Sequence, residues 1–228
     1  MLQCELCPHL PAGIFSVLPP EAMHELGRVS VCRLYEKDEI IFREGEPCNG
    51  MTLLCLGTVK LFISSEDGRQ RILDIATPCE IIAEPALVDI ASHALTAQAL
   101  EPVETHIINR VDLLAFLSTH GKVAIRLIHS LADKLRSVRF KIGEFAHQDA
   151  RSRMAALLLR LNFLYGDPKA DRPVVHLPLT REELAEMIGT TQETAIRILS
   201  QFRREKLLDL SNRRMVILKP EALSKVAS

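Results

Sequence analysis

Residues 179–202 read LTREELAEMIGTTQETAIRILSQF. Thr180 is followed three residues later by Glu183, the spacing of a capping box, in which each side chain accepts a hydrogen bond from the other residue's backbone N–H. A helix is therefore predicted to begin at this point. Gly189 can adopt the positive φ that ends a helix, so this first helix is predicted to be short.

A second helix is predicted directly after this glycine, because Thr190 and Glu193 repeat the capping-box spacing. Each helix has one apolar face. We expect these faces to consist of Leu184, Ala185 and Ile188 in the first helix and of Ala195, Ile198, Leu199 and Phe202 in the second. Two short helices joined by a tight glycine turn, with a small residue where they cross, predict a helix-turn-helix.

The opposite side of the second helix carries candidates for contacting DNA bases. Gln192, Glu193 and Arg197 are predicted to project away from the core, and the N-terminal part of such a helix reaches base edges in the major groove. Arg pairs with guanine, Glu accepts a hydrogen bond from cytosine, and Gln suits adenine. These three side chains therefore predict sequence-specific reading of DNA.

Basic residues and a hairpin follow the second helix. Arg203, Arg204 and Lys206 are placed to contact phosphate groups, and residues 207–218 predict a two-stranded wing with a basic turn. The residues predicted to bind DNA are Thr191, Gln192, Glu193, Arg197, Arg203, Arg213 and Arg214. The alternative, a helical hairpin with a solvated charged face, is disfavoured by the two adjacent caps, the glycine turn and the wing.

Charge is distributed unevenly along the chain. The net charge is −1, yet residues 1–120 contain 8 Lys/Arg and 17 Asp/Glu while residues 121–228 contain 20 and 12, so the two halves carry −9 and +8. A basic segment gains affinity for DNA by releasing its counterions, and we therefore expect DNA to bind the C-terminal half. All six cysteines lie in the acidic half, so sulfur chemistry is expected there.

Neither a targeting signal nor a membrane-spanning segment is predicted. No run approaches 18 consecutive apolar residues, which is the length that a membrane helix requires. The first residues lack the basic and apolar stretches of a secretory signal. We therefore expect no membrane partner and a cytoplasmic protein, in which cysteines are normally reduced.

Residues 29–110 break into short apolar runs separated by turn residues, which predicts an antiparallel sandwich or barrel. The runs cover residues 39–42, 51–56, 58–63, 71–75 and 105–108. The sequence EDG at 66–68 predicts a hairpin between two of these runs.

The periodicity changes after Thr119 to that of a long helix. Apolar or small residues recur at alternating steps of four and three, the a/d spacing of a coiled-coil seam, at Ala124, Ile128, Leu131, Leu135, Val138, Ile142 and Phe145. So narrow a stripe favours homodimerisation through a partner helix, and the alternative is a helix packed against its own domain. A further helix is predicted from Asp149 to Tyr165.

The order of these parts resembles the CRP/FNR family of transcription regulators over nearly the whole chain. Its most specific segment is TQETAIRIL at 191–199, which is similar to the family's recognition helix with its E-T-x-x-R core. The resemblance implies that Glu193 and Arg197 read bases, that the site is a palindromic double-stranded DNA with TGA-containing half-sites, and that RNA polymerase is a partner. It also implies a jelly-roll sensor domain with Gly45 and Gly57 at its turns.

The predicted fold class is therefore α+β with three parts. These are an N-terminal antiparallel β jelly-roll sensor domain of the cyclic-nucleotide-binding type (1–118), a long dimerisation helix (119–147) and a C-terminal winged helix-turn-helix (148–228).

The resemblance places an effector pocket at Glu84 and His93. In nucleotide-binding members a Glu precedes an Arg-Ser pair that holds the cyclic phosphate. Glu84 matches this Glu, but His93 and Ala94 stand where the pair is expected, so the phosphate would lack a bidentate cationic partner. Cyclic AMP is therefore not expected to bind.

Cys4 and Cys7 have the C-x-x-C spacing with which two thiolates can bind one metal. The oxygen-sensing members of the family carry a longer N-terminal cysteine cluster and one distant cysteine, whose place is taken here by His106. An iron–sulfur cluster, haem and a thiol–disulfide switch between Cys4 and Cys7 all stay open. The further ligands of a cluster would have to come from His9, Cys32, Cys48, Cys79 or His106, although Cys32 and Cys55 lie in strand-like runs that favour small core residues.

These features predict a homodimeric transcription regulator that responds to a redox, gas or small-molecule signal, and not an enzyme. One alternative is a constitutive DNA binder whose N-terminal domain serves only as a dimer scaffold. The other is a thiol redox enzyme that uses Cys4 and Cys7. It is disfavoured because this pair does not lie at a helix start within a βαβ unit, where the pKa of a thiol is lowered.

Overall fold

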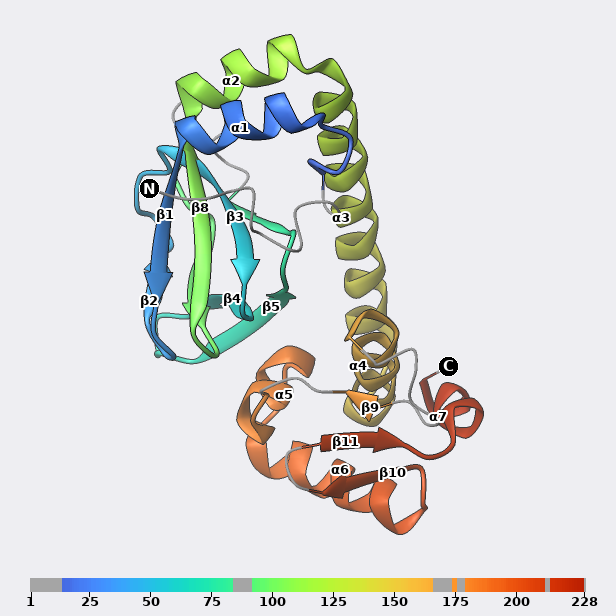
Figure 1. The fold of residues 1–228 in the computed structure, drawn as a ribbon. Helices are drawn as coiled ribbons and strands as arrows, with labels where there is room; N and C mark the ends of the chain where they lie inside the picture. Colours follow the sequence, from blue (N-terminus) through green and yellow to red (C-terminus); the bar gives the residue numbers. More distant parts are fainter. Residues whose placement is uncertain (1–13, 84–91, 166–173, 176–178, 212–213, 228) are drawn as a thin grey trace. The chain divides into compact units, whose positions relative to one another are not determined.

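The structure is a computed structural model, and it describes residues 14–83, 92–165, 174–175, 179–211 and 214–227. The chain forms two compact units, Met1–Ser137 and Val138–Ser228, and the boundary falls inside one long helix. Antiparallel strands dominate the first unit, and helices with a small sheet form the second (Figure 1). The predicted α+β fold class is confirmed.

Two four-stranded antiparallel sheets form the first unit. Their strands are β1 (Ser30–Tyr35), β2 (Ile40–Phe42), β3 (Gly50–Leu56), β4 (Val59–Ser64), β5 (Gln70–Ala76), β6 (Ile81–Ala83), β7 (Thr96–Ala99) and β8 (Val103–Asn109). The orders β1-β8-β3-β6 and β2-β7-β4-β5 place strands that are distant in sequence side by side, as in a jelly roll. All five predicted apolar runs lie in strands, and Cys32, which was also expected in a strand, lies in β1. Strands β6 and β7 had not been predicted.

Glycines with positive φ occupy the turns between these strands. Gly68, with φ of 80°, lies in the predicted hairpin between β4 and β5, where the backbone N–H of Ser65 donates to the carbonyl of Arg69 at 2.9 Å. Gly57 has φ of 84°, and a Cβ there would collide with the carbonyl of Pro102. At Gly57 both the backbone conformation and the close approach require glycine.

Apolar side chains from both sheets and three helices form one core in this unit. Helix α1 (Pro20–Val29) contributes Leu26, and α2 (Arg110–Thr119) contributes Leu113 and Phe116. The backbone N–H of Asp112 donates to the side chain of Asn109 at 3.0 Å. This cap begins α2 directly after β8, so strand and helix form one continuous segment.

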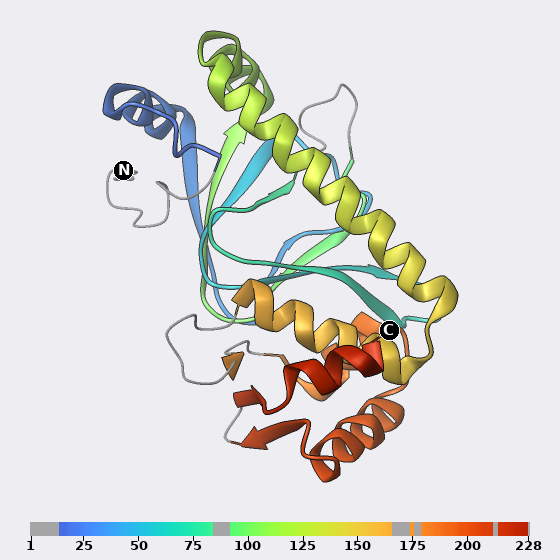
Figure 2. The ribbon, with the colours of Figure 1, turned by 90° about the vertical axis from the view of Figure 1, so that its right-hand side faces the viewer.

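Helix α3 (Gly121–His147) is the long helix predicted from the steps of four and three, and Figure 2 shows it along its whole length. Val123 and Leu127 are buried in the core of the first unit. The ammonium of Lys134 donates to the carbonyl of Ile81 at 2.6 Å. One face of α3 therefore packs on its own domain, as the alternative interpretation of the sequence proposed for the helix.

The second unit is built on α4 (Ala150–Tyr165), which buries Met154, Leu158 and Leu161. The other elements are β9 (Val174–Val175), α5 (Arg181–Ile188), α6 (Gln192–Arg204), β10 (Leu208–Ser211), β11 (Arg214–Ile217) and α7 (Pro220–Ala227). Helix α7 packs along α4 (Figure 2). Strands β10, β11 and β9 form an antiparallel sheet in that order. The wing was predicted, whereas β9 and α7 were not.

Helix α4 begins one residue after the predicted start because Asp149 caps it. The backbone N–H of Ser152 donates to the Asp149 carboxylate at 2.7 Å. This hydrogen bond holds the pKa of the carboxyl below its usual value. Across the part of the chain that the structure describes, no helix combines the length and apolar character needed to cross a membrane.

Candidate nucleic-acid interface

The first helix of the predicted helix-turn-helix is α5, and its capping box is present in full. The side chain of Thr180 accepts a hydrogen bond from the N–H of Glu183 at 3.1 Å, and the Glu183 carboxylate accepts one from the N–H of Thr180 at 2.7 Å. Gly189 ends the helix in the left-handed conformation, with φ of 65°. The predictions for the start and the end of this helix are confirmed.

The second predicted cap was wrong by one residue. Helix α6 is capped by Thr191, whose side-chain oxygen accepts a hydrogen bond from the N–H of Thr194 at 3.3 Å. Thr190 is engaged elsewhere, because its N–H donates to the carbonyl of Ala185 at 3.0 Å and so completes the end of α5. The termination of one helix therefore moves the start of the next by one position.

The two helices pack through the faces that the sequence predicted. Leu184, Ala185 and Ile188 of α5 are buried, and α6 buries Ala195, Ile198, Leu199 and Phe202. Gln192, Glu193 and Arg197 are exposed on the other side of α6, together with Thr191 at its cap. This arrangement leaves the first turns of α6 open to a ligand while the rest of the helix is fixed in the core.

Two arginines of α4 hold the helix-turn-helix in place. Arg153 donates to the carbonyl of Ile188, the last residue of α5, at 2.9 Å and to the carbonyl of Gln148 at 2.5 Å. The guanidinium of Arg151 lies 2.7 Å from the Glu205 carboxylate, at the end of α6, and over the ring of Phe202. These two positive charges therefore serve the fold, which the sequence pattern gave no means of distinguishing from DNA contacts.

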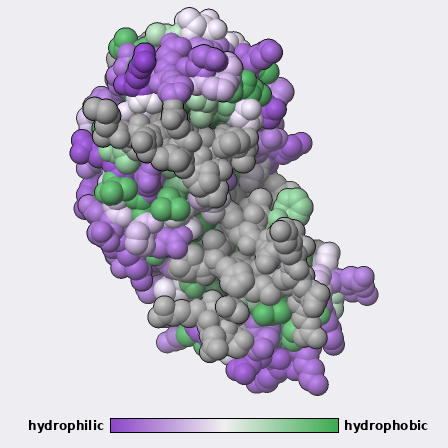
Figure 3. Space-filling view, viewed as in Figure 1, coloured by the Kyte–Doolittle hydropathy of each residue, from purple (hydrophilic) through white to green (hydrophobic). Residues whose placement is uncertain are grey.

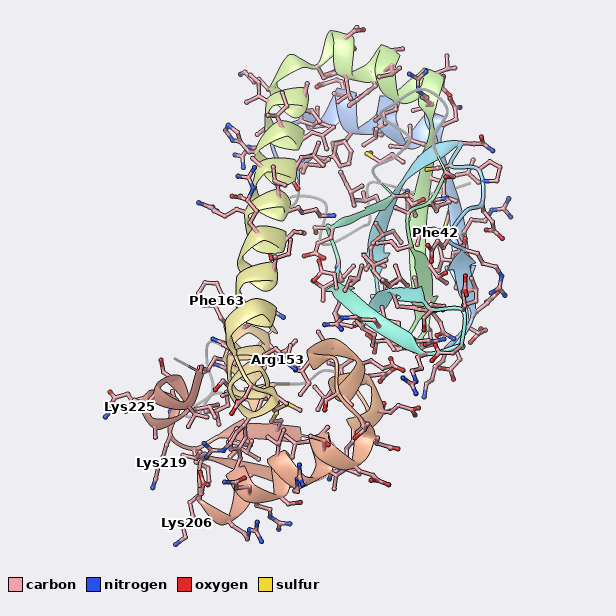
Figure 4. The ribbon with its side chains drawn as sticks, turned by 180° about the vertical axis from the view of Figure 1, so that it is seen from behind. Phe42, Arg153, Phe163, Lys206, Lys219 and Lys225 are labelled. Atoms are coloured by element: carbon pink, nitrogen blue, oxygen red, sulfur yellow. The ribbon has the colours of Figure 1, made fainter. Side chains whose placement is uncertain are left out.

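Other basic side chains of this unit point outward. Arg203, Arg204 and Lys206 are exposed at the end of α6. Figure 4 shows Lys206 extending away from the fold, whereas Arg153 lies among the helices. In Figure 3 the atoms at the end of the unit where α6 and β10 lie are hydrophilic. Arg213 and the side chain of Arg214, predicted at the tip of the wing, lie outside the described residues.

The predicted dimer seam on α3 is divided between two environments. Leu131 packs partly against the core of its own unit, and Ala124 is half-buried. In contrast, 63% of Ile128, 51% of Leu135, 50% of Val138 and 63% of Ile142 are exposed. The side chain of Phe145 lies outside the described residues. An apolar stripe that runs from Ile128 to Ile142 is thus left in contact with solvent.

Of the predicted effector residues, His93 is described and Glu84 is not. The ring of His93 is stacked on Phe42, with 3.8 Å between the ring centroids and 12° between the planes. Burial lowers the pKa of His93, and the charge of Glu46 opposes this shift in part. Burial therefore favours the neutral form of the ring, which is a poorer partner for a phosphate than a charged arginine.

The candidate cysteine and histidine ligands of the first unit lie in different surroundings. Cys4, Cys7 and His9 lie outside the described residues. Cys48 and Cys55 are buried in the core, as the sequence predicted for Cys55. The same prediction was wrong for Cys32, which is only half-buried and lies outside the core cluster. Cys32 lies next to His106 and, unexpectedly, Glu104. Each of the three residues offers one ligand atom, and these three atoms all lie within 4.8 Å of one another.

The chain matches two family models. One describes a cyclic nucleotide-binding domain and matches residues 32–120, and the other describes a Crp-like helix-turn-helix domain and matches residues 152–226. Together they cover the sheets of the first unit and most of the second unit.

Known proteins are similar to this chain over most of their length. The CRP-like cAMP-activated global transcriptional regulator of Mycobacterium tuberculosis is 26% identical, over 95% of this chain and 96% of its own. The anaerobic regulatory protein of Bacillus subtilis is 25% identical, over 85% and 82%. The solved structure of FixK2 from Bradyrhizobium japonicum, 25% identical, superposes with a TM-score of 0.78 and covers 88% of this chain and 98% of its own.

Proposed function

The chain belongs to the CRP/FNR family of transcription regulators, and we propose that it binds a palindromic DNA site as a homodimer under the control of its N-terminal domain. The relatives are regulators with a DNA-binding helix-turn-helix, so the chain is a regulator and not an enzyme. The single observation that carries the proposal is the open first part of α6. Arg197 is exposed there on a helix whose other face is fully packed.

Three side chains of α6 supply the chemistry for reading bases. Arg197 can donate two hydrogen bonds to one guanine, and Glu193 can accept a hydrogen bond from a cytosine amino group. Gln192 lies before them on the same exposed surface and suits adenine. Since Arg197 stands one turn after Glu193, the two side chains can reach neighbouring base pairs of a half-site. TGA-containing half-sites are the sequence that the family resemblance implies.

The exposed stripe of α3 supports a homodimer. Ile128, Leu135 and Ile142 recur every seven residues, and each is at least half exposed. Covering such a seam with the same seam of a second copy buries apolar surface on both chains. Two recognition helices in a dimer bind half-sites whose centres are about 34–36 Å apart, which is why the site is proposed to be palindromic.

The proposed signal is a redox change, a gas or a small molecule other than cyclic AMP. By the family resemblance, His93 stands where nucleotide-binding members have the arginine that holds the cyclic phosphate. The ring of His93 is stacked on Phe42, and burial lowers its pKa, which disfavours the charged form. An iron–sulfur cluster or haem in the N-terminal domain is compatible with the cysteines and histidines of that half. RNA polymerase is the proposed partner once the dimer is on DNA.

Binding to defined duplexes tests this function. Fluorescence anisotropy would compare a palindrome of two TGA-containing half-sites with a shuffled duplex of equal composition, at fixed salt. We expect the palindrome to bind at least about 1,000-fold more tightly, with one dimer per duplex by sedimentation. Equal affinities for the two duplexes, or a monomeric complex, would contradict the proposal.

The same assay separates regulation from constitutive binding. Protein purified without oxygen is expected to differ from aerobic protein in its affinity for the palindrome, or to change affinity when a gas or small molecule is added. Cyclic AMP is expected to leave the affinity unchanged. Equal affinity in every state would favour the constitutive alternative.

A further inference from the structure

Strands β1 and β8 bring together three side chains that the DNA-binding function does not use. In the antiparallel register of the two strands, Cys32 lies directly opposite His106, and Leu34 lies opposite Glu104. Residues two apart on a strand share one face, so Cys32, Glu104 and His106 project from the same side of the sheet. The paired backbones fix their separation, although Cys32 is 74 positions from His106 in the sequence.

The distances among these three side chains suit a single metal ion. Nε2 of His106 lies 3.4 Å from Oε1 of Glu104, and each residue, Cys32 included, offers a ligand atom within 4.8 Å of the others. Ligand bonds of about 2.0–2.3 Å in a tetrahedral site place nitrogen, oxygen and sulfur donors about 3.4–3.6 Å apart. The His–Glu pair already has this separation, and the Cys32 sulfur, which lies within 4.8 Å of both partners, would move closer to them when a metal binds.

Ser30 orients the histidine for this role. Its hydroxyl lies 3.4 Å from Nδ1 of His106, on the ring edge away from Glu104. Histidines that bind metals through one ring nitrogen almost always use the other nitrogen for a hydrogen bond, which fixes the tautomer. With Nδ1–H donating to the Ser30 hydroxyl, Nε2 carries the lone pair and faces the other two ligands.

The ligand set selects the class of metal. Thiolate and imidazole ligands suit zinc and neighbouring first-row metals, whereas calcium and magnesium require oxygen ligands. The side chain of His106 is 4% exposed and that of Glu104 is 31% exposed, so the site is enclosed on one side and open to water on the other. Three protein ligands with one position left for water are a common arrangement for zinc.

We propose that Cys32, Glu104 and His106 bind one zinc-like divalent cation, with water as the fourth ligand, and so clamp the edge strand β1 to β8. The site is independent of the DNA-binding function, since it is built within one sheet of the first unit. Because β8 continues directly into α2, the ion would also fix the strand that leads into the helices.

The test uses the full-length chain stripped of metal with a chelator and titrated with Co²⁺, whose bond to a thiolate absorbs in the near ultraviolet. One equivalent per chain is expected to develop this absorption, and Zn²⁺ is expected to displace the cobalt. Cys32→Ser is expected to abolish the absorption. His106→Gln and Glu104→Gln are expected to weaken Zn²⁺ binding at least about tenfold.

Two controls assign the binding to these residues. Cys79→Ser changes a cysteine of the same unit outside the cluster, and the double variant Cys4→Ser/Cys7→Ser removes the C-x-x-C pair; both are expected to retain one equivalent. Circular dichroism checks that each variant is folded, and Glu104→Gln, which changes a partly exposed side chain, serves if Cys32→Ser does not fold. Absence of stoichiometric binding, absorption that persists in Cys32→Ser, or its loss in the double variant would overturn the proposal.

Discussion

The two units of the chain assemble their functional side chains over very different distances in the sequence. In the second unit, Gln192, Glu193 and Arg197 lie within six residues on one helix. In the first unit, Cys32 meets His106 only because β1 pairs with β8. A recognition helix carries its chemistry locally, whereas the chemistry of a sheet depends on which strands are neighbours. The function of the second unit can therefore be predicted from a short stretch of sequence, whereas that of the first unit cannot.

The use of charged side chains differs in the same way. The second unit places two cations, Arg151 and Arg153, where they bond the ends of α6 and α5, and it leaves Arg197 exposed. The first unit buries uncharged or paired groups, such as His93 on Phe42 and His106 beside Glu104. The second unit presents charged side chains on its surface. The first unit keeps the groups that could bind a small ligand or an ion largely buried.

The largest expected effect tests whether the two units are independent. Phe202→Ala removes a side chain that is 0% exposed in the core of the second unit, and it should cost about 3–5 kcal/mol of that unit's unfolding free energy. Hydrogen exchange followed peptide by peptide should show faster exchange in α4 to α7 with little change in β1 to β8.

The matched variant for the first unit is Phe116→Ala, which empties a site that is 3% exposed. It should accelerate exchange in the sheets and leave α5 and α6 protected. Simultaneous loss of protection in both units, from either variant, would mean that the chain unfolds as one cooperative body.

The next effect concerns α3, the one element that both units share. Leu135→Glu places a carboxylate on the exposed stripe of each protomer. In the dimer, the exposed half of Leu135 would be covered on both chains. Losing this burial should weaken the dimer by about 2–3 kcal/mol, which is on the order of 30- to 150-fold in its dissociation constant. Sedimentation equilibrium measures this change.

Val111→Glu is the control for Leu135→Glu, because Val111 is 75% exposed on α2 and lies outside the stripe. It should leave the dimer unchanged. If the two variants raise the dissociation constant of the dimer equally, or if neither raises it, the stripe is not the dimer contact.

The fold of the second unit was largely predictable because its signals are local. A period of 3.6 residues places Ala195, Ile198, Leu199 and Phe202 on one face, and all four are buried. The cap at Thr190 was mispredicted because spacing alone does not show that its N–H is used to end α5. The α3 stripe had a similar ambiguity: the spacing identified one face, but only the packing shows that Leu131 turns partly toward its own core.

The candidate site of the first unit could be predicted only in part. The strands and the turn at Gly68 follow from local patterns, but the pairing of β1 with β8 depends on contacts across the whole sheet. Cys32 and His106 were named among several candidate ligands, and nothing in the sequence selected them or added Glu104. The contacts of Arg151 and Arg153 were not foreseen for the same reason, since Arg153 and Ile188 are 35 positions apart.

A smaller effect tests the local reading surface of α6. Arg197→Ala should cost about 1–3 kcal/mol of binding free energy on the palindrome and relax the preference at one base pair of each half-site. Arg203→Ala, on the same helix and also exposed, should weaken binding by a similar amount on every duplex because phosphates are the same in all sequences. Anisotropy on a set of duplexes with single base-pair changes distinguishes the two patterns. A uniform loss for Arg197→Ala would reassign this arginine to the phosphate backbone.

The smallest expected effect is a pH dependence confined to the first unit. Burial lowers the pKa of His93 below its usual value of 6.5, with Glu46 opposing in part. The unfolded chain therefore binds a proton at this residue more readily than the folded chain does. The stability of the first unit should fall as the pH drops below about 6.5 and should level off once the pH passes the lowered pKa.

His93→Phe keeps a ring against Phe42 but cannot bind a proton, so this part of the pH dependence should disappear. His129→Gln, a change at an exposed histidine of α3, should leave it in place. The measurement is urea unfolding at several pH values between 8 and 5, in which hydrogen exchange of β2 and β7 reports the unfolding of the first unit. Parallel curves for wild type and His93→Phe would mean that the folded protein accepts the proton at no cost, and the neutral ring would then no longer argue against a bound anion in this part of the domain.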